Sequence, residues 1–394
     1  MAAIMVILKQ TYVQNGGVKM RFLHTADWHI GKRLHDFDLI EDQKAAYQQM
    51  IQIAEEEKVD AIVIAGDLYD RALASEESVQ TLNGMLEDLN LKRHWPVLAI
   101  SGNHDSAIRL ETGTPWYQAT HFYLHTKLAQ AFDPVTIGDT QFFLLPYFEP
   151  VDARLYFDRD DIHTVQAAME AIVAEMQTHF EAGKQHVLVA HFFAAGSSHS
   201  DSETKIEVGG LNAVPVDLMA CFDYVALGHL HNRDALHEDR VRYSGSPLKF
   251  SVSEKDQTKG VWIVDTNPFA IHFRAITPIH DVVELTNNFK TLIDPAFYQD
   301  INRNDFIAVT LTDVDVIPNV MQELRQIYPH IIELHRQQAL TVDAPTEGVQ
   351  RRQLAPMTLL TDYFEAVTGH ALDDQQQKWA EQSLQKLQHH DTEA

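Results

Sequence analysis

Five short apolar runs in the sequence each lead into aspartate, histidine or asparagine residues. These side chains offer carboxylate, imidazole and amide donors without a thiolate, a set that suits manganese, iron or zinc better than calcium. Active sites of α/β sheets lie where strands end, so we expect these residues to meet at one edge of a core. The residues are Asp27 and His29 after 21–25, Asp67 and Asp70 after 61–65, Asn103 and His104 after 97–100, His191 after 187–190, and His229 and His231 after 224–227.

Each of these fragments is weak evidence for a site when it is taken alone. A single histidine after a strand is more often structural, and the Gly-Asn-His-Asp stretch at 102–105 is rich in turn-forming residues. Five fragments in succession, each after an apolar run, favour a shared binuclear metal site. Two cations about 3.5–4 Å apart need a carboxylate between them. We predict that Asp67 is that bridge.

Short apolar runs alternate with helical patterns from residue 21 to about 275. The runs predict buried strands, and the alternation of strand and helix predicts a layered α/β core. The last helix has apolar residues at three-four spacing and is expected to end at Gly183. The expected strands are 22–24, 61–65, 97–100, 142–145, 187–190 and 224–227, and the expected helices are 40–57, 75–92 and 162–182.

A smaller unit and a helical tail follow the core. The pattern predicts strands at 282–285, 306–311 and 331–334 and a helix at 318–327. We place the domain boundaries at 20–278 for the core, 279–340 for the small α/β unit and 341–394 for a linker and two tail helices. The first tail helix would carry an apolar stripe of Leu359, Leu360, Tyr363, Phe364 and Val367, and the second a thinner one of Ala380, Leu384 and Leu387.

The composition is that of an ordinary folded protein. The 394 residues are 45% hydrophobic and 22% charged, and no apolar run reaches the roughly 18 residues that span a bilayer. Cys221 is the single cysteine, so an intrachain disulfide is impossible and a reducing cytoplasm is expected. The net charge of −25 is unusual for a DNA enzyme, because basic contacts with phosphates supply most DNA affinity. Three explanations would reconcile this charge with DNA as substrate. The acidic residues would lie away from the DNA, bound metal ions would offset part of the charge, or a partner protein would bind the DNA.

Residues 1–19 differ from the rest of the chain because they contain no acidic residue. No positive residue precedes their apolar stretch, so a secretory signal peptide is not expected. We hypothesise that Met20 is the true start and that 1–19 is a start-site artefact. A disordered leader is the alternative.

The motif set resembles that of the calcineurin-like metallophosphoesterases, which is D-x-H, G-D-x-x-D, G-N-H-D or G-N-H-E, a lone H, and G-H-x-H. The resemblance implies a layered β-sandwich core flanked by helices and two divalent cations, with manganese expected. It also implies that His104 protonates the leaving oxygen or stabilises its charge, and that the Asp70 carboxylate orients His104. In the implied ligand sets, Asp27, His29, Asp67 and His231 hold one metal, and Asp67, Asn103, His191 and His229 hold the other.

Longer stretches are similar to the bacterial SbcD family of nuclease subunits. They are residues 20–32, 66–71, 200–203 and 243–249. Val252 departs from the pattern, since a phenylalanine is expected there. The resemblance implies a cytoplasmic, nucleoid-associated DNA nuclease for repair and recombination, with 3′ to 5′ exonuclease activity on double strands and endonuclease activity on single strands and hairpins. It further implies a capping domain at 279–340 and a homodimer within a heterotetramer, with tail helices that dock on an SbcC-like coiled-coil ATPase.

Two other functions remain open on the sequence alone. The metal motifs also suit a phosphoesterase that acts on a nucleotide or another small phosphodiester. The small unit and the tail disfavour that alternative, because a minimal small-substrate enzyme needs neither. A scaffold with a decayed metal site is disfavoured because every motif residue is present. The first tail stripe would either dock on a partner or pack on the chain's own small unit.

Overall fold

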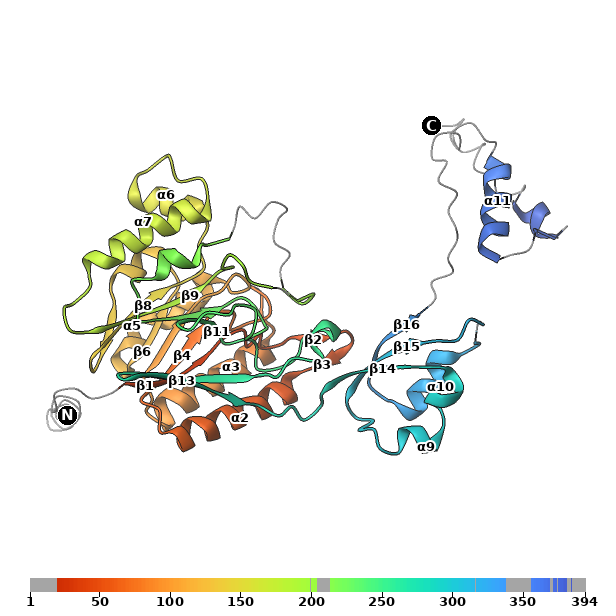
Figure 1. Cartoon of the computed structure of the whole chain (residues 1–394), viewed down its shortest axis with the longest axis horizontal. Helices are drawn as coiled ribbons and strands as arrows, with labels where there is room; N and C mark the ends of the chain where they lie inside the picture. The colour runs from red at the N-terminus through yellow and green to blue at the C-terminus, as the bar shows by residue number, and fades with distance from the viewer. Residues whose placement is uncertain are drawn as a thin grey trace. The chain divides into compact units, whose positions relative to one another are not determined.

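The computed structural model describes residues 20–198, 200–203, 213–315, 317–337, 356–368, 371–373, 375–380 and 384 (Figure 1). The predicted leader at 1–19 and the linker around Pro345 lie outside these residues. The chain divides into two compact units. The first extends to residue 285 and includes 300–308 and 324–333, whereas the second consists of 286–299, 309–323 and the residues from 334 onward.

A six-stranded sheet forms one layer of the first unit, in the order β13-β12-β1-β4-β5-β6. β1, β4, β5 and β6 run parallel to one another, and β12 and β13 add an antiparallel edge. All five residues of β4 are buried, as expected for a parallel strand that is covered on both faces. The strands are β1 (Arg21–Thr25), β4 (Ala61–Ala65), β5 (Val97–Ile100), β6 (Phe122–His125), β12 (Gly260–Thr266) and β13 (Phe269–Ala275).

A five-stranded sheet, in the order β11-β10-β9-β8-β7, forms the second layer. Its inner face shares one apolar core with the first sheet, in which the ring of Phe22 lies 5.4 Å from that of Phe142 and 5.9 Å from that of Tyr224. The two stacked sheets confirm the predicted layered α/β core. The strands are β7 (Val135–Ile137), β8 (Thr140–Leu145), β9 (Gln185–His191), β10 (Tyr224–Gly228) and β11 (Val241–Tyr243).

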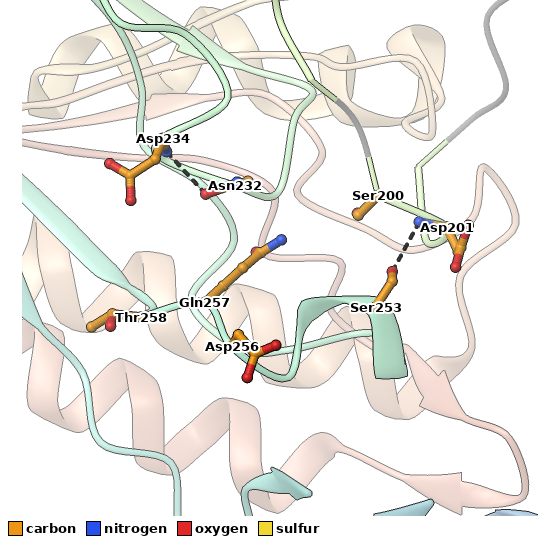
Figure 2. Close-up of a pocket in the computed structure, with 8 residues that line it drawn as sticks. All are labelled: Ser200, Asp201, Asn232, Asp234, Ser253, Asp256, Gln257 and Thr258. Atoms are coloured by element: carbon orange, nitrogen blue, oxygen red, sulfur yellow. Dashed lines mark hydrogen bonds between the residues drawn. The ribbon is translucent and has the colours of Figure 1, made fainter. Parts of the chain in front are cut away.

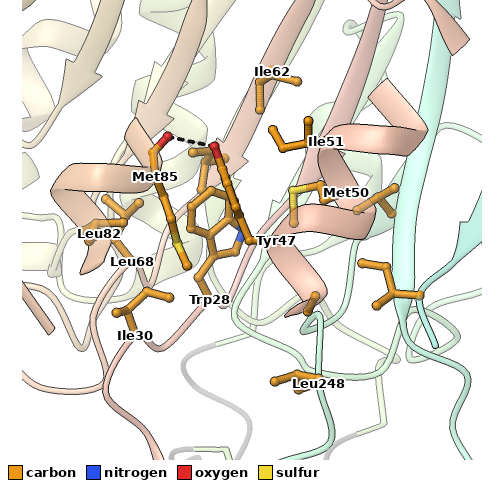
Figure 3. Close-up of a cluster of buried hydrophobic side chains, with 14 of the residues drawn as sticks. Trp28, Ile30, Tyr47, Met50, Ile51, Ile62, Leu68, Leu82, Met85 and Leu248 are labelled. Atoms are coloured by element: carbon orange, nitrogen blue, oxygen red, sulfur yellow. Dashed lines mark hydrogen bonds between the residues drawn. The ribbon is translucent and has the colours of Figure 1, made fainter. Parts of the chain in front are cut away.

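Helices cover the outer faces of both sheets. α2 (Ile40–Glu57) and α3 (Glu76–Glu87) pack on the six-stranded sheet, where the Tyr47 hydroxyl donates to the Met85 carbonyl at 2.9 Å (Figure 3). α6 (Pro150–Phe157) and α7 (Val165–Thr178) share a core with the other sheet. Figure 1 shows α2 and α7 on opposite sides of the two sheets. The order helix, sheet, sheet, helix follows from strands that are apolar on both faces.

The observed helices differ from the predicted ones at their ends. The 75–92 helix ends as a π-helical turn (Asp88–Lys92). α7 begins at its Thr164 cap, whose hydroxyl accepts from Ala167 N at 3.1 Å, and it ends at His179 instead of Gly183. The cause is Gln141 of the neighbouring strand, because its side chain accepts from Glu181 N (2.8 Å) and donates to the carbonyl of His179 (3.3 Å). The backbone beyond 178 therefore bonds to the sheet.

Several elements were not predicted. The sequence patterns did not identify β6, β7 and the antiparallel strands β12 and β13, nor the short parallel strand β11. The pair β2 (Arg33–Leu34) and β3 (Phe37–Asp38) also forms an unpredicted two-stranded ribbon. The turn at Gly183 has a φ of +81°, so glycine is needed there for a turn after the helix.

The predicted elements of the small unit are present. β14 (Val282–Asn287), β15 (Phe306–Leu311) and β16 (Ile331–Arg336) pair in that order, and α10 (Val320–Ile327) matches the expected 318–327 helix. α8 (Phe289–Leu292) and α9 (Pro295–Tyr298) are short. In the tail, α11 (Pro356–Thr368) and residues 375–380 are helical, whereas Leu387 of the thinner stripe lies outside the described residues. The domain boundaries stay a prediction. None of the described helices is long and apolar enough to cross a membrane.

The two sheets lie close together where β10 ends. A Cβ on Gly228 would lie 2.0 Å from the main-chain oxygen of Ala65 in β4 and 2.8 Å from Ala26 Cβ. His191 Nδ1, at the end of β9, donates to the same Ala65 oxygen at 2.8 Å. Only a residue without a side chain fits at this point, so Gly228 sets how closely the polar strand ends of the two sheets can meet.

Replacing Gly228 with alanine should therefore force the two sheets apart. We expect Gly228→Ala to lower the free energy of unfolding by about 1–3 kcal/mol, as for other overpacked cores, measured by urea denaturation. Gly84→Ala is the matched control, because Gly84 lies in α3 and a methyl group added there would meet no atom within 4 Å. This control should raise the stability by about 0.5–1 kcal/mol. Wild-type stability in Gly228→Ala would contradict the close approach.

Candidate metal centre

Unusual backbone conformations mark the ends of three strands in the first unit. Asp27 and His29 follow β1, Asp67 follows β4 and His229 follows β10, and their φ angles are 53°, 44°, 51° and 95°. Left-handed backbone at a residue other than glycine costs roughly 1–3 kcal/mol and gathers at functional sites. The turns after β1 and β4 are joined, since Asp27 N donates to the Gly66 carbonyl and His29 N to that of Asp67, each at 3.0 Å. These turns hold their side chains together at one edge of the sheets.

The carboxylate of Asp67 lies at the centre of this cluster and is 2% exposed. Its Oδ2 lies 3.2 Å from His191 Nε2 and 3.6 Å from His29 Nε2. Its Oδ1 accepts a hydrogen bond from the main-chain N of His104 at 2.9 Å. Because His29 follows a strand of one sheet and His191 ends a strand of the other, Asp67 joins the two layers.

Two further histidines and Asn103 complete the cluster. His231 Nε2 lies 3.1 Å from His29 Nε2. The amide oxygen of Asn103 lies 3.0 Å from His191 Nε2 and 3.1 Å from His229 Nδ1. The structure thus brings together all seven residues that the sequence predicts as ligands. Potential ligand atoms lie within 4.8 Å of one another in three groups, Asp27-His29-His231, Asp27-Asp67-His191 and His29-Asp70-His104.

The chemistry of the cluster fits divalent cations. Among the described residues, Asp27 and Asp67 have histidines, and no lysine or arginine, as ion-pair partners. A buried carboxylate needs a compensating positive charge. His29 Nδ1 is buried without a hydrogen-bond partner, and its Nε2 faces a second ring nitrogen. Oxygen and imidazole donors that face a common centre are the ligands that manganese, iron and zinc prefer.

The pKa values in the cluster show how strongly its charges depend on one another. Burial raises the pKa of Asp27 to about 7, although His191 and His231 lower it. Burial alone would also raise the pKa of Asp67, but His191 and His29 hold it well below its usual range. Burial opposes a charge on His191, yet the Asp67 carboxylate raises the pKa of His191 to about 9. A positive charge beside Asp67 therefore stabilises the cluster, and a divalent cation would supply it directly.

The main chain of Asp70 contacts His104, and a carboxylate oxygen of Asp70 lies within 4.8 Å of a ring nitrogen of His104. The ring Nδ1 of His104 donates to the main-chain carbonyl of Asp70 at 2.9 Å, whereas the carboxylate was predicted as the orienting group. The Asp70 carboxylate is directed to the Lys32 ammonium, 2.9 Å from its Oδ1. The ring of His29 packs edge-on against that of His104, with centroids 4.7 Å apart. Asp70 can therefore orient His104 through its main chain.

Asp105 lies beside the cluster and was not predicted as a site residue. Its carboxylate accepts hydrogen bonds from the main-chain N of Leu68 (3.1 Å), Tyr69 (2.9 Å) and Gly102 (2.9 Å). Burial, together with the nearby Asp67, raises the pKa of Asp105 to about 7. This side chain ties the loop after β4 to the loop after β5. Its place in the Gly-Asn-His-Asp stretch was the available signal, but nothing in the sequence indicated which backbone groups it would bind.

A polar hollow of about 470 Å³ is lined in part by Asn232 and Ser253, the chain neighbours of His231 and Glu254 (Figure 2). None of the nine predicted site residues lines it. Its lining includes three carboxylates and no lysine or arginine, so it is unfavourable for a polyanion. The hollow is therefore distinct from the metal cluster. Its lining residues are Ser200, Asp201, Asn232, Asp234, Ser253, Asp256, Gln257 and Thr258.

Comparison with known proteins agrees with the chemistry of the cluster. Residues 20–233 match the calcineurin-like phosphoesterase family, and residues 278–368 match the type 5 capsule protein repressor C-terminal domain. The SbcD subunit of the nuclease SbcCD from Staphylococcus epidermidis is 35% identical over 80% of this chain and 85% of its own length. The SbcD subunit from Staphylococcus saprophyticus is 32% identical over 93% of this chain and 98% of its own length.

Solved structures give weaker likenesses. A dimetal phosphatase from Danio rerio aligns with 66% of this chain and 97% of its own, at 12% identity and a TM-score of 0.39. The phosphoesterase Yfce from E. coli aligns with 66% of this chain and 100% of its own, at 15% identity and a TM-score of 0.28. These scores are too low to support an argument about function.

Removing the charge of Asp67 should weaken the binding of both cations. We expect Asp67→Asn to lose at least one of two bound manganese ions, because the neutral amide cannot offset the repulsion between two cations. Calorimetric titration and metal analysis of the purified protein would measure this loss. Asp42→Asn is the matched control, since Asp42 is also buried but pairs with His280 outside the cluster. Two ions bound with wild-type affinity in Asp67→Asn would refute the bridging role.

Proposed function

The chain belongs to the calcineurin-like phosphoesterases and, within them, to the SbcD family of nuclease subunits, and from this premise we propose that it is a manganese-dependent DNA nuclease that degrades double strands from their 3′ ends and cuts single strands and hairpins. It is a hydrolase of phosphodiester bonds with a divalent-metal site. The observation that carries the proposal is the clustering of six residues with oxygen or nitrogen donors around a seventh, the buried carboxylate of Asp67, with His104 beside them.

In this proposal the donors would form two sets that share Asp67. Bound divalent cations polarise phosphoryl oxygens and lower the pKa of a water molecule, which is the chemistry that a phosphodiester requires. The carboxylates and imidazoles orient the cations, and Asp67 offsets their repulsion. In the proposed ligand sets, Asp27, His29, Asp67 and His231 hold one cation, and Asp67, Asn103, His191 and His229 hold the other.

His104 is the proposed general acid. Its backbone N–H is bound to Asp67 and its Nδ1–H to the Asp70 carbonyl, so both the position and the tautomer of the ring are restrained. With Nδ1 engaged, Nε2 is the nitrogen that can pass a proton to the leaving oxygen. A positioned histidine of this kind contributes about 10²–10⁴-fold to a reaction rate. Lys32, which pairs with Asp70, keeps that loop in place.

A phosphoesterase for a nucleotide or another small diester is the alternative. The family match at 278–368 and helix α11 favour the nuclease, because the match to the SbcD proteins continues beyond the metal-binding core. The net charge of −25 is compatible with DNA as substrate if a partner supplies most of the contacts with phosphates. We propose that this partner is an SMC-like coiled-coil ATPase of the SbcC type. A homodimer of this chain would join it in a cytoplasmic, nucleoid-associated heterotetramer for DNA repair and recombination.

A nuclease assay with a His104 variant tests the proposal. Wild-type protein with manganese should shorten end-labelled linear duplex DNA from its 3′ ends and open hairpins, and it should favour these substrates over bis-p-nitrophenyl phosphate. His104→Gln should lower the rate by about 10²–10⁴-fold and keep both metals. His163→Gln, an exposed histidine elsewhere in the chain, is the control and should be fully active. Hydrolysis of the small diester alone would favour the alternative function, and loss of the metals in His104→Gln would make His104 a ligand.

Helix α11 is the proposed docking element for the ATPase. Leu359 and Leu360 are each 37% exposed and Tyr363 is 71% exposed, which places large apolar groups on the surface of the helix. An amphipathic helix that lies in a partner's groove uses anchors at this spacing. Packing of the helix on the chain's own small unit is the alternative.

Charged residues on this face should separate the two proteins without affecting catalysis. We expect Leu360→Asp combined with Tyr363→Asp to abolish co-purification with the cognate ATPase, because carboxylates would have to be buried at the interface. The manganese-dependent nuclease of the isolated chain should be unchanged. Thr358→Asp adds a charge at another exposed position of the same helix and serves as the control. Undiminished association would place the docking site elsewhere, and loss of intrinsic activity would show that the helix belongs to the catalytic fold.

A further inference from the structure

His231 is held at three polar points by two segments that supply none of the proposed metal ligands. Its main-chain N donates to Glu203 Oε1 at 2.6 Å, and its carbonyl accepts from Lys259 Nζ at 2.8 Å. Its ring Nδ1 lies 2.7 Å from the hydroxyl oxygen of Ser202. The backbone and the ring of this residue are therefore fixed together, by 202–203 on one side and by 254–259 on the other.

The hydrogen atoms in this contact can be assigned from the groups involved. Ser202 also hydrogen-bonds to Glu254 Oε1, and Glu254 Oε2 lies 2.5 Å from the ammonium of Lys259. An ionised carboxylate only accepts hydrogen bonds, so the hydroxyl proton of Ser202 goes to Glu254. The hydroxyl oxygen is then free to accept, and His231 Nδ1 must carry the hydrogen. This arrangement leaves a lone pair on Nε2, which faces the cluster 3.1 Å from His29 Nε2.

The ion pair behind Ser202 is buried and well satisfied. Glu254 is fully buried, and the side chain of Lys259 is 4% exposed. Besides Glu254, the ammonium donates to the hydroxyl of Ser246 at 3.0 Å and to the side-chain oxygen of Gln257 at 2.8 Å. Because each polar atom has a partner, the pair can keep its geometry despite the cost of burying two charges.

Another histidine at the end of the second sheet, His191, is held in a simpler way. His191 Nδ1 donates directly to the main-chain carbonyl of Ala65, which is part of β4. A sheet carbonyl is a rigid acceptor. At His231 the place of such a carbonyl is taken by the hydroxyl of Ser202, which is backed by the carboxylate of Glu254 and the ammonium of Lys259.

We propose that Ser202, Glu254 and Lys259 form a positioning relay that fixes the ring and the tautomer of His231 so that Nε2 can bind a metal ion. The inference rests on the proposed metal site, since it assigns a purpose to the orientation of one proposed ligand. Groups that hold a metal-binding histidine through its second nitrogen typically change metal affinity by about 10–100-fold when they are removed. The relay would thus act on the affinity for the cation through His231.

Manganese binding to the metal-free full-length protein tests the relay without relying on activity. We expect Ser202→Ala to weaken the binding of at least one ion by about 10–100-fold in calorimetric titration. Ser202→Thr keeps the hydroxyl and should restore most of the affinity. Ser253→Ala is the matched control, because Ser253 is an exposed serine next to Glu254 whose hydroxyl hydrogen-bonds to Asp201 N and Ser251. It should bind manganese as the wild type does.

A second variant examines the ion pair. Glu254→Gln alone would leave the Lys259 ammonium buried without its counter-ion, so Glu254→Gln is combined with Lys259→Met. The double variant should keep a cooperative thermal transition in chelator and bind manganese about 10-fold more weakly or worse. Unchanged affinity in Ser202→Ala, or equal losses in the alanine and threonine variants, would overturn the relay. Absence of manganese binding by the wild type would overturn the proposed function instead.

Discussion

A buried negative charge, the carboxylate of Asp67, is the constraint on which the rest of the site depends. It lies between the two sheets at 2% exposure, and an isolated carboxylate in such a place costs several kcal/mol. His29 and His191 approach it from different sheets, and the main-chain N of His104 completes its surroundings. The fold therefore has to deliver positive or hydrogen-bonding groups from several strand ends to one point. The order of strands in the two sheets achieves this because the parallel strands end on the same side.

The close approach of the loops around Asp67 depends on residues without side chains. A Cβ on Gly102 would lie 2.1 Å from Asp67 Oδ1, and Gly228 leaves similarly little space at the end of β10. The left-handed turns at Asp27, His29 and Asp67 are strained by roughly 1–3 kcal/mol each. The apolar cores on both sides of each sheet offset this strain, since their burial is the dominant stabilising term in folding. These strained positions carry three of the predicted ligands, and all three side chains are buried.

Much of this arrangement could be predicted from the sequence because strand and site are adjacent in the chain. A buried parallel strand is a continuous apolar run. The residues directly after it, such as Asp67 after β4, therefore lie at the edge of the sheet where the parallel strands end. Contacts between segments far apart could not be predicted in this way. Gln141 ends α7 through hydrogen bonds to the residues that follow the helix, and the carbonyl of Asp70 binds His104, although its carboxylate was the obvious candidate. These outcomes depend on distances that exist only in the folded chain.

The surroundings of His231 illustrate the same limit at the site itself. Ser202, Glu254 and Lys259 are about 30 residues or fewer from His231 in the chain, yet no periodicity links them, because Ser202 and Lys259 lie in irregular segments and Glu254 ends a short 3-10 helix. Their pairing becomes visible only as a buried ion pair next to a histidine. Burial explains why such a pair has to be complete, since removing either charge leaves the other one unsolvated. A cation that binds the folded chain alone adds stability that grows with its concentration, by about 2.7 kcal/mol at 100 times its dissociation constant. If His231 binds a cation as proposed, the groups that orient its ring affect both the chemistry of the cluster and the stability of the fold around it.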